Sequence, residues 1–299
     1  MGSAGVTIMY QKASAILNFP SIFSEILIFF TTVIAILIAI IYLIKTIVHF
    51  DIVRAEFYDR IRINFFASIS ISLLMLSIIY EMVHSDTHVY LFYIGTILQT
   101  FLTLYTISFW INHNFEIHHS NPAWFIPIVG NLLVPLAGSH ILATNILLAY
   151  FAIGMFFWVV LFSITFNRII FHHQLPEKFL PTFFIFIAPP AVGFIAYVKL
   201  SGTVDFFAHF LLSLAYFFAM LLNFMARNFL KIRYYISWWA FIFPLSAVTI
   251  ASLLIFQEVN DPVYYYASLF FGVGATLSFL YVSFFTIRQI LNGSLCIED

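Results

Sequence analysis

Residues 21–48 read SIFSEILIFFTTVIAILIAIIYLIKTIV, an apolar run in which Glu25 and Lys45 are the only charged residues. About 20 such residues are enough to cross the hydrocarbon of a bilayer as a helix. The composition of all 299 residues agrees, since 63% are hydrophobic, only 8% are charged and the mean hydropathy is +1.03. A soluble domain carries about 25% charged residues. The sequence therefore predicts an all-α integral membrane protein that lies in the lipid bilayer.

Similar apolar runs recur along the chain. They cover 61–83, 88–111, 123–141, 143–167, 180–200, 204–226, 236–257 and 263–287. Residues 1–17 form a shorter apolar run, which we count as helix 1. Helices 3, 5, 7 and 9 then begin near residues 61, 123, 180 and 236, at intervals of about one helical hairpin. The spacing predicts about ten transmembrane helices in five hairpins, within a single channel or transporter domain over 1–299.

The basic residues test this count, because Lys and Arg accumulate on the cytoplasmic side of a membrane protein. With ten helices, the loops on one side hold Lys12 and Lys199 as their only basic residues. The other side holds Lys45, Arg54, Arg60, Arg62, Arg168, Lys178, Arg227, Lys231, Arg233 and Arg288. This separation predicts a multi-pass protein with both termini in the cytoplasm.

The prolines distinguish two kinds of helix. Six of the ten prolines lie inside expected helices, all of them odd-numbered, at Pro127, Pro135, Pro181, Pro189, Pro190 and Pro244. Proline kinks a helix and frees a carbonyl group, which in a membrane must be satisfied by protein or by water in a cavity. We therefore expect kinked odd helices around a central pore and even helices outside them. The expected pore-lining residues are Ser68, Ser72, Pro127, Gly130, Asn131, Pro135, Pro189, Pro190, Gly193, Pro244, Ser246, Ala247 and Ile250. The alternative is close helix packing through small residues.

Charged residues are absent from the middle third of every expected helix. Coupled transporters usually keep a carboxylate or a broken-helix cation site there, whereas a passive pore needs neither. The absence favours a pore for small inorganic or organic anions. Phe243 precedes Pro244 and shares a helix face with Ala247 and Ile250. A phenyl ring at this position would close a pore by excluding water, and the alternative is ordinary core packing.

Other classes of function find little support. The net charge of −1 excludes a nucleic-acid partner, which requires a basic surface. A membrane haem protein needs histidines on facing helices, but His113, His118, His119, His172 and His173 fall in expected loops. The alternative interpretation of these histidines is a metal site in a loop. We expect no enzyme activity, no metal and no cofactor.

Three segments resemble the tellurite-resistance/dicarboxylate transporter family, which includes bacterial TehA-type proteins and plant slow-type anion channels. They are VRAEFY at 53–58 followed by Arg60, NPAWFIPIVG at 121–130, and WWAFIFP at 238–244. The resemblance implies five hairpins around a pore in each subunit of a homotrimer with three separate pores. It also implies anion conductance, a bacterial-type inner membrane location, and Phe243 as the gate of the pore.

Two expectations follow from comparison with that family. The first helix of the family normally begins well before the segment that matches residues 1–5, so helix 1 of this chain is expected to be truncated at its N-terminus. Some members transport malate or are linked to tellurite resistance. A proton-coupled C4-dicarboxylate transporter or a tellurite-resistance exporter of the same fold is therefore the alternative to an anion channel.

Overall fold

The computed structural model describes residues 1–172 and 175–293 and contains only helices and connecting segments in those ranges. Eight helical segments are long and apolar enough to cross a membrane. They are α2 (Ser21–Val48), α4 (Ile63–Glu81), α5 (Thr87–Asn112), α8 (Thr144–Phe171), η4 with α9 (Glu177–Ile187 and Ala188–Ser201), α10 (Phe206–Phe224), η5 with α12 (Ile236–Phe241 and Ile242–Val259) and α13 (Pro262–Leu291). The predicted all-α integral membrane class is confirmed.

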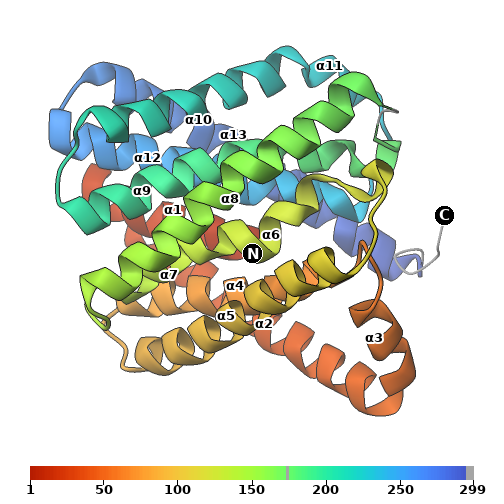
Figure 1. Cartoon of the computed structure of the whole chain (residues 1–299). Helices are drawn as coiled ribbons and strands as arrows, with labels where there is room; N and C mark the ends of the chain where they lie inside the picture. The colour runs from red at the N-terminus through yellow and green to blue at the C-terminus, as the bar shows by residue number, and fades with distance from the viewer. Residues whose placement is uncertain (173–174, 294–299) are drawn as a thin grey trace.

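Two shorter apolar segments complete the bundle. The first is α1 (Gly2–Leu17), and the second is a broken helix between α5 and α8. The broken helix consists of η2 (Pro122–Trp124), α6 (Phe125–Val129), η3 (Gly130–Leu132) and α7 (Leu133–Gly138). Both segments are mostly buried inside the protein (Figure 1). Both are shorter than the eight long segments, although they lie at the centre of the fold.

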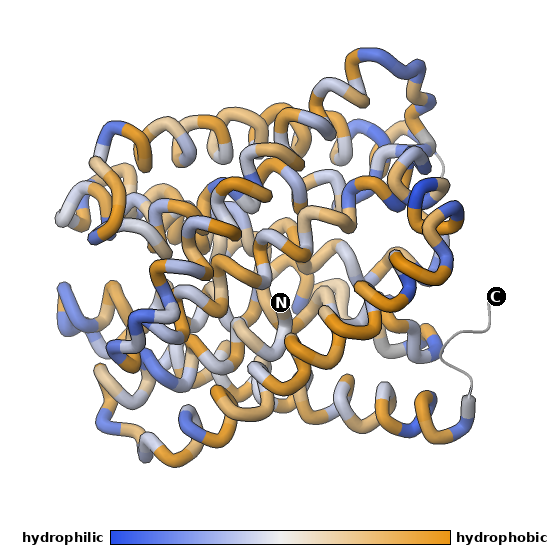
Figure 2. The backbone as a smooth tube through the Cα atoms, turned by 90° about the horizontal axis from the view of Figure 1, so that it is seen from below, coloured by the Kyte–Doolittle hydropathy of each residue, from blue (hydrophilic) through white to orange (hydrophobic). Residues whose placement is uncertain are grey.

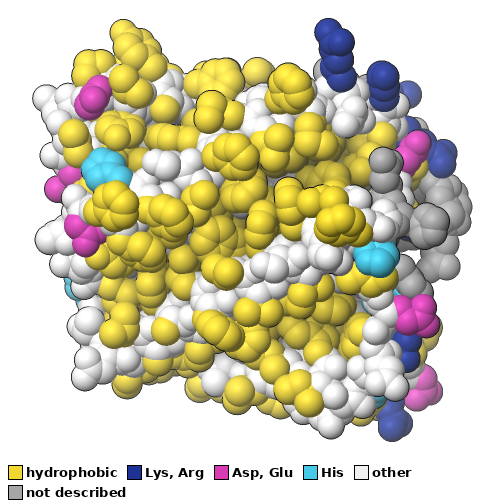
Figure 3. Space-filling model, turned by 45° about the horizontal axis from the view of Figure 1, so that its top comes forward, with side chains coloured by type: hydrophobic (Ala, Val, Ile, Leu, Met, Phe, Trp, Pro, Cys, Tyr) yellow, Lys and Arg dark blue, Asp and Glu magenta, His cyan; other side chains and the backbone are white. Residues whose placement is uncertain are grey.

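Inner and outer helices differ in burial. In the most apolar stretch of α2 only 6% of the residues are buried, and in that of α13 only 17%. The corresponding share is 78% for Glu177–Ser201 and 67% for Ile236–Val259. The flank of the molecule is therefore covered by apolar side chains (Figure 3), and the backbone tube is hydrophilic mainly toward its two ends (Figure 2). Such a surface suits lipid around the flank and water at both ends.

The buried segments pack against one another in a closed ring. Helix α1 contacts α4 and α12, α4 contacts α6 and α7, α7 contacts α9, and α9 contacts α12. Each is also packed against the long helix that follows it in sequence: α2 on α1, α5 on α4, α8 on α6 and α7, α10 on α9, and α13 on α12. Gly2 allows α1 to lie close to η5, because a Cβ atom on Gly2 would lie 2.9 Å from Cε3 of Trp239.

Lys and Arg side chains gather at one end of the bundle, where α3 (Phe50–Phe57) and α11 (Ala226–Leu230) lie (Figures 1 and 3). The sequence analysis treated 50–57 as part of a loop, and this was wrong. The segment is a short helix with charged residues and a buried Val53, too short and too polar to be recognised as a span.

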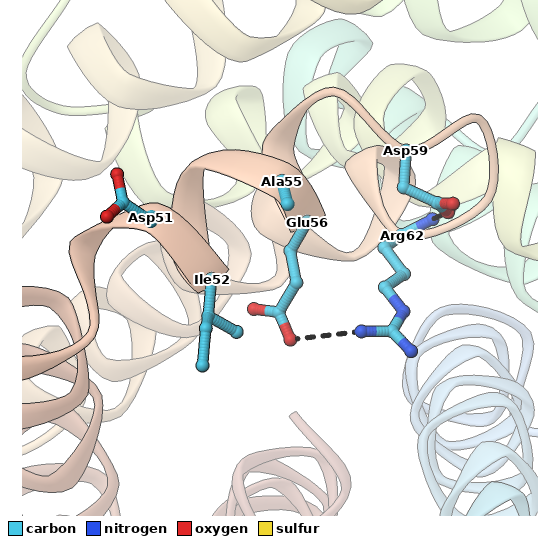
Figure 4. A pocket seen from close by; sticks show the side chains of 6 residues that line it. All are labelled: Asp51, Ile52, Ala55, Glu56, Asp59 and Arg62. Atoms are coloured by element: carbon cyan, nitrogen blue, oxygen red, sulfur yellow. Dashed lines mark hydrogen bonds and ion pairs between the residues drawn. The ribbon is translucent and has the colours of Figure 1, made fainter.

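The carboxylate of Glu56 connects α3 to its neighbours. It lies 2.9 Å from Nζ of Lys45. It also lies 3.3 Å from Nη1 of Arg62 (Figure 4). The side chain of Arg62 is 54% exposed, and ion pairs with such exposed partners contribute at most about 1 kcal/mol. A hollow of about 420 Å³ is lined only by residues 51–62, so it lies outside the ring of buried helices.

Helix α10 begins at a capping carboxylate. Asp205 accepts hydrogen bonds from the N–H groups of Phe207 at 3.0 Å and Ala208 at 3.1 Å, and from the hydroxyl of Tyr197. The Tyr197 hydroxyl, followed by the Ala208 amide, holds the pKa of Asp205 below its ordinary value of 3.8. The charged carboxylate therefore stabilises the folded protein above the ordinary pKa, and this contribution is lost as the pH falls through the lower folded value.

We expect acidification below pH 3.8 to lower the melting temperature of the parent protein more than that of Asp205→Asn. Asparagine also caps helices well but does not titrate, so it isolates the contribution of the charge. The measurement is thermal unfolding in detergent between about pH 7 and pH 3. Parallel curves for the two proteins would contradict the assignment.

Candidate conduction pathway

Phe243 lies where the 3-10 helix η5 passes into α12. Its side chain is half-buried and faces α1, because a Cβ atom on Gly5 would lie 3.2 Å from Cδ2 of Phe243. The same Cβ atom would lie 3.4 Å from Cβ of Ser246. The absence of a side chain at Gly5 therefore allows α12 to approach α1 closely at this level. Ala247 and Ile250, four and seven residues after Phe243, continue the same face of α12 and are buried.

Of the three expected pore serines, Ser68 and Ser72 lie on α4 and are half-buried, whereas Ser246 on α12 is buried and donates to the Ile242 carbonyl at 2.9 Å. Ser70 donates to Oε1 of Gln99 at 2.7 Å and Ser77 to the His88 carbonyl at 2.8 Å, so this face of α4 packs against α5. Ser68 and Ser72 are each two residues from Ser70 and therefore lie on the other side of the helix. Ser72 donates to the Ser68 carbonyl at 2.7 Å. The structure thus turns both hydroxyls away from the outer helix α5.

Three other expected pore residues contact neighbouring helices. A Cβ atom on Gly130 would lie 2.7 Å from Cδ1 of Ile71, and one on Gly193 would lie 3.0 Å from Sδ of Met155 in α8. The Asn131 amide donates to Oγ1 of Thr103 at 2.9 Å. Gly130, Asn131 and Gly193 therefore contact neighbouring helices, and their role in lining a pore stays a prediction.

The prolines have a common position. Pro127, Pro135, Pro189, Pro190 and Pro244 are all buried and all lie within the first three residues of α6, α7, α9 or α12. Proline is tolerated there because the N–H groups of a first turn have no partner within the helix. A 3-10 segment precedes each of these α segments. The bends of the inner helices are thus junctions between 3-10 and α geometry, and not the interruptions within long α-helices that the sequence predicted.

A polar cluster supports the broken helix at the first of these junctions. The Pro127 carbonyl accepts from Nε2 of Gln99 at 2.8 Å and from Oγ1 of Thr103 at 2.8 Å. Both donors belong to α5, and Gln99 is fully buried. The sequence analysis missed them because it examined the odd helices. The recurrence of Thr96, Gln99, Thr103 and Thr106 every three or four residues along α5 is the signal that indicates a buried polar face.

The sequence analysis also missed an ionic cluster at the end of the bundle opposite α3. Nζ of Lys199 lies 3.4 Å from Oε1 of Glu81 and donates to the Leu136 carbonyl at 2.6 Å. Nε2 of His140 lies 3.8 Å from the same Glu81 oxygen. Lys12 of α1 interacts electrostatically with both Glu81 and Lys199. Separated by up to about 190 positions in the sequence, these residues meet only in the folded chain.

The histidines bear on the haem and metal alternatives. Of the residues named for them, His118 has an undescribed side chain and His173 lies outside the described residues. Among the described residues, no three His, Cys, Asp or Glu side chains lie close enough together to hold a metal ion.

Comparison with known proteins agrees with the membrane architecture. The family described as "SLAC1: Voltage-dependent anion channel" matches residues 1–287. The S-type anion channel SLAH2 of Arabidopsis thaliana is 30% identical over 292 residues, which cover 95% of this chain and 55% of the relative. SLAH1 of the same plant is 30% identical over 87% of this chain and 69% of its own length. A TehA homolog of Haemophilus influenzae, named a tellurite resistance protein, is 25% identical over 71% of this chain and 65% of its own length.

This chain matches only part of the length of these relatives. The chain spans about half the length of SLAH2 and less of SLAH3, which it matches over 39% of that protein. The match to the family, in contrast, extends over nearly all of the chain and includes all three segments quoted from the sequence. The chain therefore belongs to the voltage-dependent anion channel family, a family of membrane channels and transporters and not of enzymes.

Proposed function

We propose that this chain forms a pore for small anions that the Phe243 ring closes. The observation that carries the proposal is the contact of this half-buried ring with Gly5 between two helices of the closed inner ring. An apolar constriction closes a pore by excluding water and opens it when the ring moves. Anions then pass hydroxyl groups and backbone dipoles without a charged binding site at the centre of the bilayer.

The proposed pore is surrounded by ten helices in five hairpins within one domain. The pairing of each buried segment with the next helix in sequence supports this arrangement, as does the closed ring of α1, α4, the broken helix, α9 and α12. The proposed wall consists of Ser68, Ser72, Phe243, Ala247 and Ile250, with the prolines shaping the helices behind them. We propose that the C-terminus faces the cytoplasm, because the end of α13 lies at the basic end with α3 and α11, and that the N-terminus faces the same side, because α1 runs away from that end. We also propose a homotrimer with a separate pore in each subunit, as the family resemblance implies.

The proposal predicts passive anion flux through the purified protein. After reconstitution into planar bilayers, we expect currents that reverse at the equilibrium potential of chloride or nitrate and are indifferent to a pH gradient. A matched control is Gly274→Ala on α13, where an added Cβ atom meets nothing within 4 Å.

The alternative mechanism gives a different result. A proton-coupled dicarboxylate transporter takes up labelled malate into vesicles only while a pH gradient is present, and its transport stops when the gradient collapses. Malate uptake of that kind, without anion current, would overturn the proposed pore.

A further inference from the structure

The inner helices all run in the same direction. Helices α1, α4, α7, α9 and α12 end at Leu17, Glu81, Gly138, Ser201 and Val259, at the end of the bundle opposite α3. The C-terminus of a helix carries a partial negative charge of roughly half an elementary charge. Five parallel C-termini make this mouth of the bundle unfavourable for an anion. If anions cross the bundle, something must offset that field.

Two lysines are placed to do so. Lys199 lies in the last turn of α9, and its ammonium group donates to the Leu136 carbonyl near the C-terminus of α7. Lys12 projects from α1, half-buried, and interacts electrostatically with Lys199. The ten other lysines and arginines flank the loops expected on the opposite side of the membrane. The mouth thus holds two lysines, whose charges influence each other.

One carboxylate does not neutralise two ammonium groups. Glu81 pairs with Lys199 at 3.4 Å, whereas no carboxylate of the described residues lies within 4.0 Å of the Lys12 ammonium. The side chains of Lys199 and Glu81 are 31% and 20% exposed, so the pair lies at the rim, where it adds little to stability. Lys12, Lys199 and Glu81 together therefore carry one net positive charge beside water.

We propose that Lys12 and Lys199 form an entry site for a monovalent inorganic anion. When no anion is bound, the Glu81 carboxylate pairs with Lys199 and thus competes with the anion for it. This inference rests on the proposed anion pore and adds the group that recruits the ion at this mouth. A basic cluster at a pore entrance raises the local concentration of anions. A bound anion accepts from the Lys12 ammonium and draws Lys199 away from Glu81. One net positive charge suits chloride or nitrate better than a divalent dicarboxylate.

The test measures current against chloride concentration in the Phe243→Ala background, with chloride varied on the Glu81 side. We expect Lys199→Met to raise the half-saturating chloride concentration about threefold to tenfold, and Glu81→Gln to lower it by a similar factor. Lys12→Met is expected to act in the same direction as Lys199→Met. The matched control is Lys231→Met, which removes an exposed lysine at the opposite end of the bundle.

A second measurement separates charge from a structural role of Lys199. Cys296 is first replaced by serine, so that Lys199→Cys provides the only thiol. An aminoethyl thiosulfonate restores a positive charge and is expected to restore the parent half-saturation, whereas a sulfonatoethyl reagent is expected to raise it further. Equal effects of the two reagents, or equal half-saturation in Lys199→Met and Lys231→Met, would overturn the entry site while leaving the pore intact. Absence of anion current in the Phe243→Ala background would instead overturn the pore, and the entry site with it.

Discussion

Replacement of Phe243 by alanine is expected to raise the anion current of the reconstituted protein by about tenfold or more. The Phe243 ring packs on Gly5 of α1, which has no side chain. Removal of the ring is therefore expected to open a passage between α1 and α12. A tenfold rise corresponds to a conduction barrier lower by about 1.4 kcal/mol, a modest share of the cost of dehydrating an ion at an apolar constriction. Currents are compared per reconstituted subunit, with the reversal potential recorded in each case.

Phe241 offers a matched control two residues earlier in the chain. Its ring contacts Phe184 with the centroids 4.3 Å apart, and it is buried. Phe241→Ala removes the same group from ordinary packing and is expected to reduce stability by about 3–5 kcal/mol without a comparable rise in current. Equal currents in the parent and the Phe243→Ala protein would contradict the gate. Equal increases in both alanine variants would point to loosened packing as the cause.

The second large effect is expected for Gly138→Ala at the end of α7. A Cβ atom there would lie 2.3 Å from Cζ and 2.4 Å from Cε2 of Phe92. Phe92 is fully buried, so its ring has no free space into which to move. Overpacking of this kind lowers the free energy of unfolding by about 1–3 kcal/mol. The measurement is denaturant or thermal unfolding of the purified protein in detergent.

Gly274→Ala again provides the comparison. It makes the same change within the membrane helix α13 but meets open space, and alanine favours a helix over glycine by up to about 1 kcal/mol. We expect this variant to be as stable as the parent or slightly more stable. If both variants unfold like the parent, the close approach of α7 to α5 is not as tight as the structure has it.

The class of the protein follows from its sequence because the solvent imposes it. A run such as 21–48 has few stable states other than a membrane helix. In agreement, only 6% of the most apolar stretch of α2 is buried inside the protein. The sequence singled out Phe243, because it precedes Pro244 on a face with Ala247, but it did not predict the contact with α1. The gating role itself stays a prediction.

The sequence did not reveal which way the glycines of the inner helices face, or which residues far apart in the chain come into contact. A glycine in an inner helix faces either a pore or a neighbouring helix, and Gly193 and Gly130 face Met155 and Ile71. Composition is the same in both cases, so only the rotation of each helix decides. The approach of Lys199 to Glu81 joins helices that are far apart in the chain, and no local pattern predicts it.

The 3-10 turns of the broken helix also affect how far it reaches. Its four segments contain three, five, three and six residues, too few for an ideal α-helix to cross about 30 Å of hydrocarbon. A 3-10 turn rises about 2.0 Å per residue against about 1.5 Å in an α-helix, so the segment extends about 28 Å and not about 25 Å. Hydrophobic thickness and helix winding are therefore linked in this protein. We expect thinner bilayers to favour the shorter α geometry at η2 and η3, and thicker bilayers to favour the longer 3-10 geometry.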